Sequence, residues 1–169
     1  MKKILIVLGL ALFSFSMNAQ TKVGTIDADY ILAQLPEMTQ VNEELKAYGQ
    51  EMRKDFDSTV TKYQNLVKDY QEKQSEYSET EKKQKEEEII TLESGLKGFN
   101  QKLPLMIQMR RNELTKPLFE KINAAMLKVI ERDGYTHVLH AGGNSLAFAE
   151  EKYDITEKVL TELGITPKK

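Results

Sequence analysis

The two histidines of the chain, His137 and His140, are the first residues to consider for metal or acid–base chemistry. Imidazole nitrogens bind zinc and move protons near neutral pH. Residues 135–140 have the composition of a β-strand, and side chains three positions apart on a strand point to opposite faces. The two rings therefore cannot chelate one ion together, and we interpret them as ordinary strand residues.

Residues 142–145, Gly-Gly-Asn-Ser, resemble a phosphate-binding loop only in their glycines. The Lys and the following helix of such a loop are missing, so we interpret this segment as a hairpin turn. The chain has no Cys, and no Ser stands in a nucleophile-elbow context. The acidic residues lie on expected helix surfaces without a pocket to shift their pKa values. We therefore expect no enzymatic activity, no cofactor and no metal.

Residues 1–19 have the three parts of a secretory signal peptide. Lys2 and Lys3 precede an apolar run over residues 4–15, and Ala19 ends a short polar stretch at the expected cleavage point. The run is too short for a comfortable membrane span, and no Cys follows it for lipid attachment. We expect a soluble protein in an exported compartment.

The charge balance argues against nucleic acid as a partner. The whole chain carries 24 basic and 26 acidic residues, a net charge of −2. Loss of the signal peptide removes two Lys and no acid, which leaves a net charge of −4. No basic face is then expected to neutralise phosphates.

Residues 38–117 are predicted to form an antiparallel helical hairpin, an arm with its tip near 75–80. Apolar or seam positions recur at threes and fours on both limbs, which is typical of a coiled coil. Ser78 and Glu81 form a capping box that predicts the start of the return limb. The outgoing positions are Val41, Leu45, Tyr48, Met52, Phe56, Val60, Tyr63, Val67, Tyr70, Gln74 and Tyr77. The return positions are Ile89, Leu92, Leu96, Phe99, Leu103, Met106, Arg110, Leu114 and Leu118.

Two features of the arm leave alternatives open. Pro104 and Pro117 predict kinks in the return limb, because each removes a backbone donor. The apolar cluster at residues 103–107 wraps too far around one helix for a single seam, so part of it is expected to face another subunit or a bound protein. The seam tyrosines either pack the hairpin or offer rings to an unfolded protein.

Residues 20–37 and 118–169 are predicted to form a β-rich body with short helices. We expect a strand at 22–26, a brief helix capped by Asp27 or Asp29 and ended by Pro36, and a helix over 122–130 closed by Gly134. A hairpin of strands 135–140 and 146–149 follows, and then a last helix that starts at Asp154. This body is short for an independent core, so oligomerisation is expected.

Short motifs in a characteristic order give the chain a resemblance to the Skp (OmpH-like) family of periplasmic chaperones. They are Lys-Val-Gly-Thr-Ile-Asp at 22–27, Tyr30-Ile31-Leu32, Leu35-Pro36-Glu37, the long hairpin, Lys116-Pro117-Leu118, Gly134-Tyr135 and Asp154-Ile155-Thr156. The resemblance covers nearly all of the mature chain. It implies an α+β homotrimer whose small β-barrel body carries three helical tentacles around a cavity. It also implies ATP-independent binding of unfolded outer-membrane β-barrel proteins, which prevents their aggregation.

The resemblance and the apolar pattern together assign the expected sites. Residues expected to build the oligomeric body are Val23, Ile26, Val138, Leu139, Leu146 and Phe148. Residues expected to contact clients are Tyr63, Tyr70, Tyr77, Leu103, Leu105, Met106 and Ile107. The best-known members are strongly basic whereas this chain is acidic, so contact with lipopolysaccharide or a membrane surface stays open. The alternative hypothesis is a coiled-coil adaptor or spacer of the cell envelope.

Overall fold

The computed structural model describes residues 21–143 and 145–166, so the predicted signal peptide at 1–19 lies outside the described residues. The chain divides into two compact units. One, which we call the arm, is Pro36–Leu118; the other, the body, combines the described residues up to Leu35 with those from Phe119 onward. Within the described part of the chain, every helix is too short or too polar to cross a membrane.

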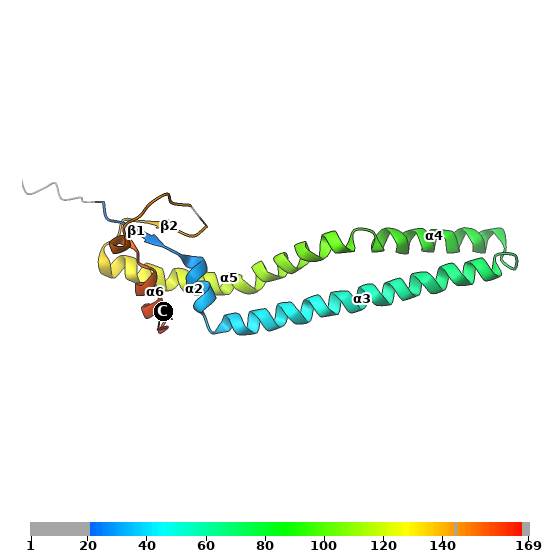
Figure 1. The fold of residues 1–169 in the computed structure, drawn as a ribbon, viewed down its shortest axis with the longest axis horizontal. Coiled ribbons are helices and arrows are strands. Elements are labelled where there is room, and N and C mark those ends of the chain that lie inside the picture. The colour runs from blue at the N-terminus through cyan, green and yellow to red at the C-terminus, as the bar shows by residue number, and fades with distance from the viewer. Residues whose placement is uncertain (1–20, 144, 167–169) are drawn as a thin grey trace, which may run out of the picture. The chain divides into compact units, whose positions relative to one another are not determined.

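The outgoing limb of the arm is one helix, α3 (Glu37–Lys73), of 37 residues. At 1.5 Å per residue it extends over roughly 55 Å. The return limb begins with α4 (Glu79–Leu96), which lies alongside α3 (Figure 1). The predicted capping box is confirmed, because the Ser78 hydroxyl accepts from Glu81 N at 3.3 Å and the Glu81 carboxylate accepts from Ser78 N at 2.8 Å.

The return limb consists of two helices rather than one. α5 (Phe99–Asp133) follows α4 after a break at Lys97 and Gly98. Gly98 has a φ of 83°, a left-handed conformation that glycine adopts without steric cost. Pro104 and Pro117 both lie inside α5. The kinks predicted at the prolines stay predictions, and the end of α4 at Gly98 is a further break that the prediction did not include.

Apolar contacts hold the two limbs of the arm together. The rings of Phe56 and Phe99 stack with centroids 4.1 Å apart. Further along, the side chain of Ile107 lies over Gly49, where an added Cβ would be 3.6 Å from its Cδ1 atom. Leu103 is also buried. Phe56, Phe99 and Leu103 belong to the predicted seam and support its register, whereas Ile107 and Gly49 lie outside the predicted positions.

The body contains a parallel pair of strands, β1 (Val23–Ile26) and β2 (His137–His140), with Val23 opposite His137. The expected hairpin with a returning strand at 146–149 is wrong, because that segment is not a strand. The Ser145 hydroxyl donates to His140 O and Gly142 O, each at 2.7 Å, and folds the chain back on itself after β2. On its other side β1 forms a bridge to Asp154.

Helices supply most of the body's core. Besides the two strands, the body contains α2 (Ala28–Gln34), the end of α5, the 3₁₀ turn η1 (Glu151–Tyr153) and α6 (Thr156–Glu162). Among the described residues the sheet has two four-residue strands, so the body of one chain is mainly helical rather than β-rich. The fully buried core side chains are Ile31, Val129, Ile155, Val159 and Leu160.

The predicted helix ends in the body are largely confirmed. The Asp27 carboxylate accepts from Tyr30 N at 2.9 Å and caps α2. Gly134 has a φ of 71° and donates to Ile130 O at the end of α5. The start of α6 is shifted by one residue, because Ile155 holds the cap position and the Asp154 carboxylate accepts from Thr156 N at 2.8 Å.

Candidate functional site

The apolar cluster at residues 103–107 points in more than one direction. Leu103 is 6% exposed, whereas Leu105 is 66% exposed. Met106 and Ile107 are half-buried. Because Leu103 is buried, it offers no accessible surface in this conformation. Leu105 is mostly exposed, as expected for part of the cluster.

Met109 is a residue that the sequence reasoning missed. It is 65% exposed and lies four residues after Leu105, so the two side chains share one face of α5. Their spacing was the available signal, but it falls outside the predicted seam. This part of α5 therefore presents both Leu105 and Met109 to solvent.

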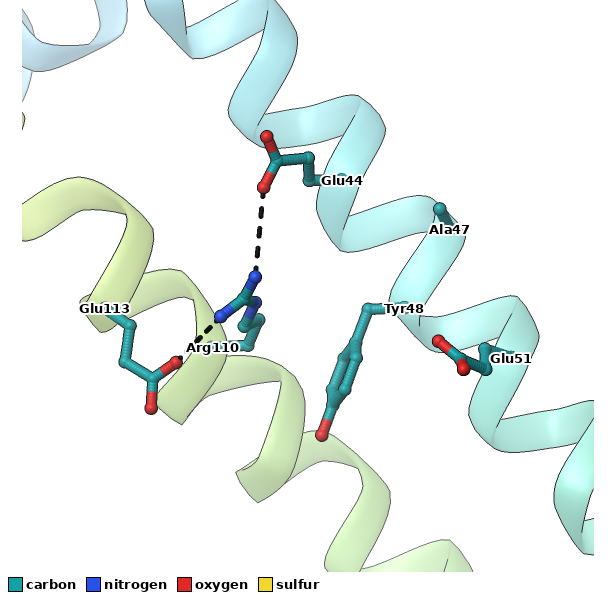
Figure 2. A pocket seen from close by; sticks show the side chains of 6 residues that line it. All are labelled: Glu44, Ala47, Tyr48, Glu51, Arg110 and Glu113. Carbon is teal, nitrogen blue, oxygen red and sulfur yellow. Dashed lines mark hydrogen bonds and ion pairs between the residues drawn. The ribbon is translucent and has the colours of Figure 1, made fainter.

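A cleft lies between α3 and α5 within the arm (Figure 2). It encloses about 480 Å³. Tyr48 extends into it from α3, and an adjoining depression brings Met106 and Met109 next to the Tyr48 ring. We call these two hollows the interlimb cleft; its lining residues are Glu44, Ala47, Tyr48, Glu51, Met106, Met109, Arg110 and Glu113.

One guanidinium and three carboxylates line the interlimb cleft. Arg110 Nη1 lies 3.1 Å from a Glu113 carboxylate oxygen, and Nη2 lies 4.0 Å from one of Glu44 (Figure 2). Glu51 has no hydrogen bond or ion pair within residues 21–143 and 145–166. The cleft therefore combines an apolar side with an excess of negative charge.

Two of the candidate tyrosines are engaged in contacts at the tip. Tyr70 donates a hydrogen bond from α3 to the Glu86 carboxylate on α4. Tyr77 donates to the Asp69 carboxylate at 2.7 Å, and its ring stacks on that of Tyr70 with centroids 6.3 Å apart. These contacts favour hairpin packing for Tyr70 and Tyr77 over contact with a client.

The same tip holds a charged cluster around Asp69. Hydrogen bonds from Lys73, Tyr77 and Lys85 hold the pKa of the Asp69 carboxyl well below its usual range. The carboxylate in turn raises the pKa of Lys73, of Lys85 and of the Tyr77 hydroxyl. Because Lys85 is on α4 and Asp69 is on α3, this cluster joins the limbs.

Tyr63 lies in a shallow groove nearer the middle of the arm. The groove is lined by Tyr63, Val67, Tyr70, Gln71, Gln74, Glu86, Ile89 and Ile90. Ile90 is 60% exposed. A role for Tyr63 in client contact stays a prediction.

The body carries an apolar surface beside its two strands. Val23 and Leu139 are more than one-third exposed, and Phe148 is 82% exposed. These side chains line a hollow with Leu146 and Tyr153, and we call the five residues the body patch. Of the other residues expected to build the oligomer, Ile26 is buried in the core and Val138 is half-buried.

A model of the family described as outer membrane protein (OmpH-like) matches residues 22–163. The chain belongs to the OmpH-like family. A crystal structure of a candidate outer membrane chaperone (OmpH-like) from Caulobacter crescentus CB15 has a TM-score of 0.60 with this chain at 14% identity. The match covers 86% of this chain and 85% of the other, and it shows a shared fold. No curated protein matches the sequence significantly.

The histidines of this OmpH-like chain form no metal site among the described residues, where no group of three or more metal-ligating side chains occurs. His140 Nε2 lies 3.5 Å from the Asp29 carboxylate, and His137 Nδ1 lies 3.1 Å from the Thr136 hydroxyl. These are ordinary surface contacts. The features that invite a functional interpretation are the interlimb cleft and the body patch.

Proposed function

We propose that this OmpH-like protein is an ATP-independent holdase chaperone of the periplasm, which binds unfolded outer-membrane β-barrel proteins and prevents their aggregation. The observation that carries the proposal is the exposure of Leu105 and Met109 on α5, where Met109 also lines the interlimb cleft of the arm. Family membership and the fold shared with a candidate outer membrane chaperone support it. The expected signal peptide at residues 1–19 supports the compartment.

The chemistry of the arm suits reversible binding of unfolded chains. Met side chains are flexible and polarizable, so they adapt to apolar groups of different shape. Such contacts are individually weak, and a client held by several of them keeps its conformational freedom. Release then needs no nucleotide, because each contact breaks independently.

We further propose that the body assembles into a homotrimer through the body patch. A two-stranded sheet is marginally stable alone, and β2 has no second strand partner within the described residues. Phe148 and Leu139 present apolar surface next to that edge. Strands and apolar side chains from other copies would complete the small barrel that the family resemblance implies.

The spacer hypothesis is favoured by one observation, the closed tip. The Ser78 capping box and the ion pair of Asp69 with Lys85 tie the end of the arm together. A spacer needs a closed seam and a polar exterior along the whole arm. The exposed Leu105 and Met109 depart from that requirement, so we favour the holdase.

The test is light scattering from a denaturant-unfolded outer-membrane β-barrel protein diluted into buffer without ATP. The mature protein should suppress the aggregation signal. The double variant Leu105→Ser, Met109→Ser should need several times more protein for the same suppression, because two exposed apolar contacts are lost. The matched control, Gln101→Ser, Gln108→Ser, changes exposed polar residues of the same helix and should behave as wild type. No suppression by folded wild-type protein would refute the holdase.

A further inference from the structure

The interlimb cleft has more negative charge than its single cation neutralises. Arg110 lies near Glu44 and Glu113 and is 42% exposed in its side chain, so its charge is already shared between two carboxylates. Glu51 is exposed and lines the same cleft, without an ion pair within residues 21–143 and 145–166. A third carboxylate is therefore available to a bound group.

Apolar and aromatic atoms lie next to these carboxylates. Tyr48 reaches from α3 toward α5, as Figure 2 shows, and Met106 and Met109 lie along the adjoining depression. The hollow lined by the carboxylates has a volume of about 480 Å³, within the range of roughly 300–1,000 Å³ in which proteins bind small groups. Apolar side chains of a bound peptide can enter the cleft while charged groups remain at its rim.

We propose that the interlimb cleft of a single arm binds extended client segments in which an aromatic or aliphatic side chain is adjacent to Lys or Arg. The apolar side chain contacts Met106 and Met109, and the neighbouring cation approaches Glu51 and the Tyr48 ring. A cation gains both from a carboxylate and from an aromatic face. This inference rests on the proposed function and adds a charge preference to it.

The carboxylates of the interlimb cleft disfavour acidic client segments. The one cation in the cleft, Arg110, is engaged by carboxylates of both limbs. An incoming carboxylate would meet Glu51 and Glu44 without a free partner for its charge. Exposed charge pairs contribute little each, so we expect roughly a three- to ten-fold preference for basic over acidic segments at low salt. The preference should narrow at high salt, because screening weakens contacts between exposed charges.

The test uses the full mature protein and three labelled, unstructured peptides that share the same Phe residues. The first carries Lys, the second Glu and the third Gln at the intervening positions, and fluorescence anisotropy measures each affinity. The Lys peptide should bind most tightly. Glu51→Gln should reduce its advantage, and Glu51→Lys should reverse it in favour of the Glu peptide. The matched control is Glu43→Lys, an exposed residue of α3 that does not line this cleft, and it should preserve the preference for Lys.

A reporter in the cleft makes the location testable as well. The chain has no Trp, so Tyr48→Trp introduces a single indole beside Met106 and Met109. Its emission should shift when the Lys peptide is added. No shift on binding, equal affinity for the three peptides, or equal effects of Glu43→Lys and Glu51→Lys would overturn the inference.

The failure of this inference is distinguishable from the failure of the proposed function. If the wild-type protein keeps the unfolded barrel protein soluble and yet shows no charge preference, only the inference about the interlimb cleft is wrong. If the folded protein neither keeps the unfolded barrel protein soluble nor binds any of the peptides, the proposed holdase function itself is refuted. Circular dichroism of each variant establishes that the arm remains helical.

Discussion

Truncation of Phe148 to alanine should weaken self-association without unfolding the body. The side chain is 82% exposed in the single chain. Aromatic side chains bury roughly 200 Å², so about 160 Å² of Phe148 is available to a neighbouring copy. At about 25 cal/mol per Å² its burial contributes at most about 4 kcal/mol. The ring is only partly buried in the interface, and alanine keeps the Cβ. The expected loss of association free energy is therefore about 2–3 kcal/mol per chain, which raises Kd roughly 30- to 150-fold.

Sedimentation velocity over a concentration series measures this effect directly. Wild-type protein should form trimers, and Phe148→Ala should dissociate at concentrations where the wild type remains assembled. Its far-ultraviolet circular dichroism should be unchanged, because the removed ring faces solvent in the single chain. The control Ile90→Ala removes an exposed apolar side chain of the arm and should assemble as wild type. Equal assembly of wild type and Phe148→Ala would refute the role of the body patch.

Three further perturbations test the core, the tip and the charged cluster. Leu160→Ala should cost about 2–5 kcal/mol in urea unfolding, because the fully buried side chain leaves a cavity in the body; an unchanged midpoint would contradict that core. Ser78→Ala should destabilise the start of α4 by about 1 kcal/mol, measured as faster hydrogen exchange of its first turn, whereas exchange at wild-type rates would contradict the capping box. The pKa of Asp69 is depressed in the folded arm, so its stabilising contribution is present above the ordinary carboxyl range and is lost as pH falls through the depressed value. Nuclear magnetic resonance should therefore show tip contacts that persist at pH 4 and weaken only in stronger acid, and their loss near pH 5 would contradict this assignment.

The helical arm could be predicted from the sequence because its signals are local. Apolar residues at threes and fours specify a helix with one buried stripe, and Phe56, Phe99 and Leu103 lie where that pattern places them. Ser78 and Glu81 located the tip because a capping box satisfies its own backbone groups. The break at Gly98 was missed because only Pro104 and Pro117 were considered as helix-breaking residues of the return limb.

The body was harder to predict because its two paired strands, β1 and β2, are distant from each other in the sequence. The short apolar run at 146–149 indicates a strand locally, but β2 instead pairs with β1, more than one hundred residues earlier. The helix caps at Asp27 and Gly134 were correct, since each depends on neighbouring residues alone. Local pattern therefore defined the helix ends but not the sheet.

The interlimb cleft could not be predicted from the heptad pattern. That pattern places Arg110 in the seam, where an apolar neighbour is expected. Its position opposite Glu44 depends on the spacing and rotation of the two limbs. The exposure of Met109 depends on the same geometry. The repeat of apolar residues in the sequence determines neither the spacing nor the rotation of the two limbs.

Site-specific photocrosslinking tests most directly the claim that the arm holds unfolded clients. The chain has no Cys, so Met109→Cys provides a unique attachment point for a photoactivatable maleimide. Glu131→Cys, at an exposed position of the body, serves as the control. With an unfolded outer-membrane β-barrel protein and no ATP, we expect strong crosslinks to the client from position 109 and weak ones from position 131. Equal yields at both positions, or none at position 109, would contradict it.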